Sequence, residues 1–95
     1  MDKLASQGIK FVNAYSAGPL CTPTRTGFMT GRYPARTPVG LIEPLTGTNK
    51  DSTFGLTVEY PSIATLMKTA GYETALIGKW HLGLQPQHSP TKKWF

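Results

Sequence analysis

Residues 20–31 read LCTPTRTGFMTG, and this stretch, which holds the only cysteine of the chain, decides how the remaining residues are interpreted. Its composition predicts a loop that runs directly into a short helix. Thr22 suits the N-cap, and Pro23 suits the first helical position, where its missing N–H costs nothing. Gly31 suits the left-handed residue that ends a helix. We therefore expect Cys21 immediately before a helix N-terminus, where free N–H groups and the helix dipole favour an anion.

Arg25 adds a fixed positive charge to this helix end. It follows Cys21 by about one helical turn, so its side chain can lean back toward the cysteine. A nucleophilic side chain and a cation at an anion-binding helix end predict a site for sulfate or phosphate esters.

Length and composition restrict the class of protein. The 95 residues suffice for one small domain, and 39% apolar with 16% charged residues indicates a globular chain. No run of about 18 apolar residues is present, so we expect no membrane span, and no secretory leader is recognisable. A single cysteine excludes an internal disulfide, and no Cys/His cluster has zinc spacing.

The net charge of +5 does not indicate a nucleic-acid partner. Nucleic-acid binding requires basic residues clustered on one face and interleaved with aromatic residues. Here they are spread along the chain, and the densest group, Arg25, Arg32 and Arg36, surrounds Cys21. We expect no nucleic acid among the partners.

Helices and strands are expected to alternate. The pattern predicts a helix over 2–7, a strand over 9–15, the helix after Cys21, a helix between Pro61 and Gly71, and a strand over 72–77. This order is typical of an α/β fold with parallel strands and right-handed crossovers. Two strands make an incomplete sheet, because a buried parallel sheet needs neighbours and cover on both faces.

Two parts of the chain show no periodicity. Residues 32–57 are rich in proline and glycine, and we expect loops with at most a short turn. From Leu84 onward, proline, serine and lysine predict an irregular, exposed tail, in which His88 has no role.

Lys79 and His81 form a second constellation. On an extended segment both side chains face one side, with Trp80 on the other. An ammonium beside an imidazole suits an anionic substrate, with lysine as a point charge and histidine as a proton carrier. By residue type alone, an ordinary loop is favoured, with a snorkelling lysine and a histidine bonded to a backbone carbonyl.

Two motifs resemble one family. Residues 21–25, CTPTR, are similar to the C-x-P-x-R signature of the sulfatases, and TGRYP over 30–34 resembles what usually follows it. Residues 71–83, GYETALIGKWHLG, closely resemble the second sulfatase signature, G-Y-x-T-x-x-x-G-K-W-H-x-G. The resemblance covers about residues 2–83 and is strongest to the arylsulfatase branch. It implies an alkaline-phosphatase/sulfatase-like fold.

The resemblance also implies roles for single residues. Cys21 would be oxidised to formylglycine, whose hydrate attacks the sulfate sulfur, forms a covalent sulfate ester and ligates a divalent cation, usually Ca²⁺. Arg25 would hold the hydrate, and Lys79 would clamp the sulfate oxygens. His81 would hydrogen-bond the hydrate and assist its collapse. Arg32 is interpreted as structural, tying the helix end to the loops.

Departures from the family pattern indicate a partial catalytic domain over 1–95. Members carry an aspartate pair on a first strand before this region and further site residues far downstream. The five acidic residues here include no adjacent pair and none at a motif position. We therefore expect an incomplete cation site, and a fragment that is inactive alone.

Alternatives remain open. The chain could belong to a phosphonate or phosphate monoester hydrolase of the same superfamily, or be a non-catalytic anion-binding remnant. The expected partners are a sulfate-ester substrate and a formylglycine-generating enzyme. By resemblance, the protein would be lysosomal, periplasmic or secreted.

Overall fold

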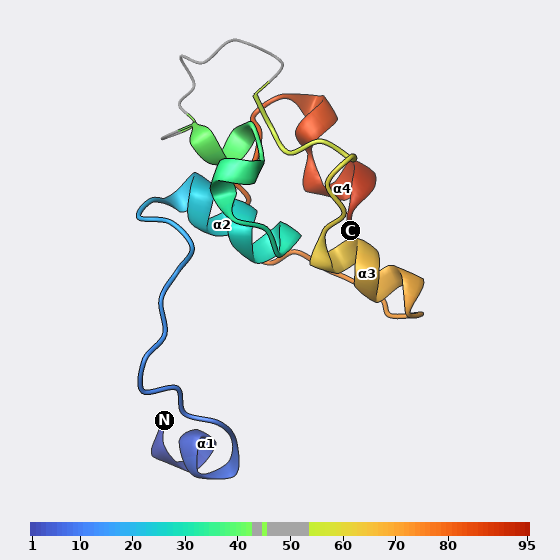
Figure 1. Cartoon of the computed structure of the whole chain (residues 1–95). Helices are drawn as coiled ribbons and strands as arrows, with labels where there is room; N and C mark the ends of the chain where they lie inside the picture. The colour runs from blue at the N-terminus through green and yellow to red at the C-terminus, as the bar shows by residue number, and fades with distance from the viewer. Residues whose placement is uncertain (43–44, 46–53) are drawn as a thin grey trace.

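A computed structural model of the chain describes residues 1–42, 45 and 54–95. The α-helices are α1 (Asp2–Gln7), α2 (Cys21–Thr30), α3 (Ile63–Thr69) and α4 (Pro90–Lys93). Short 3-10 helices are η1 (Pro34–Arg36), η2 (Val39–Leu41) and η3 (Pro86–His88). Figure 1 shows α2, α3 and α4 gathered in one body, with α1 lying apart at the end of an extended segment. Among the described helices, none has the length and apolar character needed to span a membrane.

Helix α2 begins earlier than the sequence predicted. Cys21 is its first residue, and Leu20, in an extended conformation, occupies the N-cap. The prediction of Thr22 as the N-cap is therefore wrong, and Pro23 lies within the first turn, where its missing N–H still leaves no bond unmade. The expected end is confirmed: Gly31 has φ 64°, and its N–H donates to the Gly27 carbonyl at 2.9 Å.

Helix α3 is fixed at its start by a reciprocal cap. The Thr65 N–H donates to the Ser62 hydroxyl at 3.2 Å, and the Ser62 N–H donates to the Thr65 hydroxyl at 3.4 Å. This capping box satisfies two backbone groups that the first turn leaves unpaired. The helix predicted between Pro61 and Gly71 is confirmed, with Gly71 at φ 87° just after its end.

A small apolar core lies between α2, α3 and the C-terminal segment. Its buried members come from every part of the described body: Met29, Val39, Leu45, Leu56, Ala64, Leu82 and Trp94. Trp80 packs on this core, with its ring 5.3 Å from that of Trp94 and 6.3 Å from that of Phe95. The prediction of an exposed, irregular tail after Leu84 is wrong, because this aromatic cluster holds α4 and buries Trp94 to 1% exposure.

The predicted strands over 9–15 and 72–77 do not form. Both segments lack regular structure, and most of their apolar side chains are exposed, Phe11 to 74% and Ile77 to 97%. A strand is stabilised by backbone hydrogen bonds to a neighbouring strand. Neither segment has a neighbouring strand in the described part of the chain. The described residues contain one isolated bridge, between Gly55 and Gly83. The α/β architecture thus stays a prediction.

The predicted irregular region over 32–57 is partly ordered. Helices η1 and η2 occupy most of residues 34–41 and pack against α2. Thr37 connects the two, because its hydroxyl donates to the Pro34 carbonyl at 3.0 Å and accepts from the Gly40 N–H at 3.1 Å. Residues 43–44 and 46–53, on which the rest of this prediction falls, lie outside the described residues.

Candidate functional site

Two hydrogen bonds join the cysteine helix to the loop that carries Lys79 and His81. The Arg25 Nη1 donates to the Lys79 carbonyl at 2.5 Å, across 54 residues of sequence. The Thr22 hydroxyl donates to the His81 carbonyl at 3.4 Å. Helix α2 thus positions one side of the candidate site, and the loop over 78–83 positions the other. The two sequence motifs, which are far apart in the sequence, are therefore in contact in the structure.

Two cavities adjoin this junction. One, of about 550 Å³, is lined by Cys21 and Arg25 together with Leu20 and Phe28. The other, of about 340 Å³, is lined by Arg25 and Lys79 with apolar neighbours. Arg25 therefore forms part of the wall of both cavities.

Cys21 is a free, half-buried thiol in the first turn of α2. The backbone N–H groups at the start of a helix lack partners within it, and they carry the positive end of the helix dipole. A negative charge that develops next to Cys21 would therefore be favoured by the helix itself. The prediction of this residue at a helix N-terminus is confirmed, with Cys21 two positions further into the helix than expected.

Arg25 and Lys79 offer their charge to a ligand. Within the described part of the chain neither side chain forms an ion pair. The Arg25 Nε is buried and has no hydrogen-bond partner among the described residues. Because a guanidinium can only donate, this N–H is a donor that an anionic oxygen would satisfy.

His81 is held differently from the sequence prediction. Its backbone is left-handed, with φ 55°, so it does not alternate with Lys79 along an extended segment. Its Nε2 donates to the Leu45 carbonyl at 2.7 Å, the bond to a backbone oxygen that an ordinary loop histidine makes. A carbonyl only accepts, so Nε2 carries a proton, and in the neutral form of the ring Nδ1 is an acceptor. The Nδ1 is buried without a partner among the described residues.

The structure therefore brings three of the four predicted residues to one junction. Cys21, Arg25 and Lys79 line adjoining cavities, whereas His81 is connected to them through its backbone and lines neither of these two cavities. The arrangement provides a thiol at a helix N-terminus, two cations and one unpaired imidazole nitrogen. Chemically, the helix end and the two cations can bind a tetrahedral oxyanion, and the imidazole nitrogen can accept a proton.

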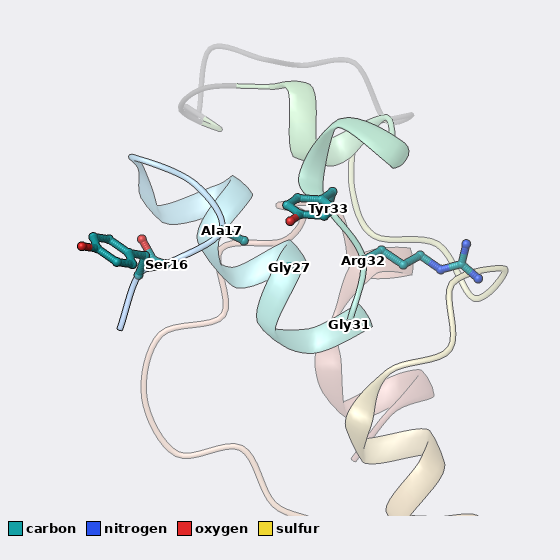
Figure 2. Close-up of a pocket in the computed structure, with 7 residues that line it drawn as sticks. Ser16, Ala17, Gly27, Gly31, Arg32 and Tyr33 are labelled. Carbon is teal, nitrogen blue, oxygen red and sulfur yellow. The ribbon is translucent and has the colours of Figure 1, made fainter. Parts of the chain in front are cut away.

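A separate cavity of about 440 Å³ lies at the other end of α2. Figure 2 shows Ala17 directed toward Gly27, and Arg32 extending away from Ser16. The Arg32 guanidinium lies over the Tyr60 ring, 5.8 Å from its centroid, which ties the helix end to the segment before α3. This contact agrees with the structural role predicted for Arg32.

Two contacts were missed by the sequence analysis. Thr22 is fully buried, and its hydroxyl links the motifs. His88, predicted to be exposed and idle, is only 5% exposed, and its Nδ1 donates to the Leu56 carbonyl at 3.0 Å. The prediction for His88 is wrong, because the C-terminal segment folds back onto the core. No motif or spacing in the sequence signals either contact.

The described residues contain no ligand set for the divalent cation expected from the resemblance. Within the described residues, no group of three or more His, Cys, Asp and Glu side chains lies close enough to hold a metal ion. Glu43 and Asp51 lie outside the described residues. A hard cation such as Ca²⁺ requires several oxygen ligands, so the residues described do not fit it.

Comparison with known proteins assigns the family. The family profile described as Sulfatase matches residues 1–95. The human steryl-sulfatase is 46% identical over 99 residues, covering 96% of this chain and 16% of that protein. The human N-acetylgalactosamine-6-sulfatase is 37% identical over 98 residues, covering 100% and 19%. The arylsulfatase of Hemicentrotus pulcherrimus is 40% identical over 89 residues, covering 94% and 16%.

The chain spans less than a fifth of the length of these three relatives. No solved structure matches it. Both signature motifs lie within the region that the family profile and these relatives share with the chain. The chain belongs to the sulfatase family.

Proposed function

We propose that these residues form part of an enzyme that hydrolyses sulfate esters, with Cys21 as the source of its nucleophile. The proposal rests on the family, and on one observation above all, the hydrogen bond from Arg25 to the Lys79 carbonyl. That bond connects two motifs that are remote in sequence, and Arg25 lines both the cavity of Cys21 and the cavity that Lys79 lines.

Each residue contributes chemistry that a sulfate ester needs. Conversion of Cys21 to formylglycine would supply an aldehyde hydrate as the nucleophile. Lys79 binds the sulfate oxygens, on which negative charge accumulates as the ester bond breaks. Arg25 directs its unpaired Nε–H toward the oxyanion, and the unpaired Nδ1 of His81 accepts a proton. No step of the proposal passes through a metal ion, and Ca²⁺ stays a prediction from the resemblance.

The test is a hybrid enzyme. In it, the matching segment of human steryl-sulfatase is replaced by this chain, which is 46% identical to that segment. We expect the hybrid to hydrolyse an aryl sulfate, and Cys21→Ala to abolish the activity, because nothing else in the site supplies the nucleophile. A hybrid that folds and carries modified Cys21 but leaves aryl sulfate intact would contradict the proposal.

The same hybrid separates the alternatives. Competition between an aryl sulfate and an aryl phosphonate distinguishes a sulfatase from a phosphonate or phosphate monoester hydrolase. A hybrid that binds inorganic sulfate without turnover of either ester would favour the non-catalytic anion-binding remnant. The isolated chain is expected to bind sulfate weakly and to be inactive, because it spans only a small part of its relatives.

The proposal includes the fold. Segments 9–15 and 72–77 are rich in apolar residues that are largely exposed, and the first precedes Cys21 whereas the second precedes Lys79. We propose that both become parallel strands of an α/β sheet when neighbouring strands are present, which would put both motifs at the carboxyl ends of strands. Modification by a formylglycine-generating enzyme, and residence in a lysosome, periplasm or extracellular space, remain predictions from the resemblance.

A further inference from the structure

His88 is packed directly behind the loop that carries Lys79 and His81. Its side chain is 5% exposed, and its Nδ1 donates to the Leu56 carbonyl at 3.0 Å. Because a carbonyl oxygen only accepts, this bond fixes the proton on Nδ1. Leu56 in turn donates its N–H to the Leu82 carbonyl at 2.7 Å. Two hydrogen bonds thus connect His88 through Leu56 to Leu82, the residue that follows His81.

The backbone of His88 also accepts a hydrogen bond from Trp80, the residue that precedes His81. The Trp80 indole N–H donates to the His88 carbonyl at 2.9 Å. His88 is therefore connected to Trp80 directly and to Leu82 through Leu56. These are the two residues that flank His81 in sequence.

Two glycines make room for the His88 side chain. A Cβ atom on Gly55 would lie 2.2 Å from the His88 Cγ, and a Cβ atom on Gly83 would lie 2.2 Å from the His88 Cβ. Both distances are far below van der Waals contact, so any larger residue at either position would displace the imidazole. Gly55 and Gly83 also form the isolated bridge that joins the two segments. The His88 side chain thus packs directly against the backbone at Gly55 and Gly83.

The backbone of His81 requires such support. Its φ of 55° is unfavourable for a residue with a side chain, and conformations of this kind persist where the surroundings over-determine them. The hydrogen bonds that connect His88 to Trp80 and Leu82 hold both neighbours of His81 in place. They therefore restrict the backbone rotation by which His81 would leave its positive φ. They also hold the carbonyl of His81 where the Thr22 hydroxyl reaches it.

We propose that His88 is a positioning residue, which holds the Lys79–His81 loop in the conformation that binds the sulfate group. This inference rests on the proposed function for the identity of the ligand. His88 does not touch the cavities at the cysteine and acts through Trp80, Leu56 and Leu82.

The test uses the 95-residue chain and two NMR measurements. The first is hydrogen exchange of the Trp80 indole N–H and of the backbone N–H groups of the loop. The second is titration with inorganic sulfate. We expect His88→Ala to accelerate this exchange, and to weaken sulfate binding, by roughly fivefold to tenfold each, as loss of a buried hydrogen bond predicts. His88→Asn, whose amide replaces the Nδ1 donor, is expected to restore both.

Thr37→Val is the matched control, because Thr37 is equally buried and its hydroxyl bonds lie within residues 34–40. It is expected to lower stability without affecting loop exchange or sulfate affinity. Equal effects of Thr37→Val and His88→Ala would overturn the proposal, as would unchanged loop exchange in His88→Ala. If His88→Ala does not fold, His88→Asn is compared with His88→Gln, whose amide is displaced, and equal behaviour of these two overturns it.

The two proposals fail in different ways. An unsubstituted chain that binds no sulfate counts against the proposed function. Unchanged exchange at the loop in His88→Ala counts against the positioning role, whatever the result with sulfate.

Discussion

Leu56→Ala is expected to lower the free energy of unfolding of the chain by about 2–5 kcal/mol. Leu56 is completely buried, and it contacts the core that α2, α3 and the C-terminal segment share. Truncation removes transfer free energy and leaves a cavity that rigid neighbours fill only in part. Since small domains are stable by only about 5–15 kcal/mol, the expected loss is a large fraction of the total. Urea unfolding followed by circular dichroism measures it.

Leu66→Ala is the matched control for this substitution. Leu66 is 64% exposed on α3, so the same chemical change is expected to alter the free energy of unfolding by no more than about 0.5 kcal/mol. Similar losses for the two leucines would show that the core described here is not what stabilises the chain.

Arg25→Ala is expected to lower kcat/KM of the hybrid enzyme by about 10²–10³, the range seen when one preorganised donor to a developing oxyanion is removed. Arg25 lines both cavities, donates to the Lys79 carbonyl and has an unpaired Nε–H. The substitution removes a charge and also the bond that holds the Lys79 loop. Steady-state hydrolysis of an aryl sulfate measures the effect.

Arg36→Ala controls for the loss of a positive charge. Arg36 is exposed at the end of η1 and lines none of the cavities described in this region. Its removal is expected to leave kcat/KM within about twofold, because a screened surface charge contributes little. A comparable loss for Arg36→Ala would mean that overall charge, rather than the position of Arg25, determines the rate.

Local signals in the sequence predicted where α2 and α3 end. Gly31 and Gly71 mark the C-terminal ends of α2 and α3, because each adopts a positive φ that other residues avoid. The proximity of the two motifs was also expected, through the family that they resemble, and the bond between Arg25 and the Lys79 carbonyl agrees with it. The helix ends depend on a few adjacent residues, which a pattern can report, whereas the proximity of the motifs was expected only from the resemblance.

Features that depend on long-range packing could not be predicted. The strand-like residues around Phe11 and Ile77 have the right composition, but a strand also requires a neighbour, and no local pattern reports one. Trp94 and His88 lie in a segment whose proline and lysine content predicted exposure, yet aromatic packing on Trp80 buries it. The left-handed backbone of His81 likewise follows from its surroundings rather than from its own residue type.

In the proposed function, Cys21 is the precursor of the nucleophile. Mass spectrometry of the Cys21 peptide tests it most directly, on chain co-produced with a formylglycine-generating enzyme. Because the chain has one cysteine, hydrazide labelling of the aldehyde reports on a single position. We expect conversion of the thiol to an aldehyde at residue 21, and no labelling of Cys21→Ala. An unmodified thiol, with the matching peptide of human steryl-sulfatase converted in the same cells, would contradict it.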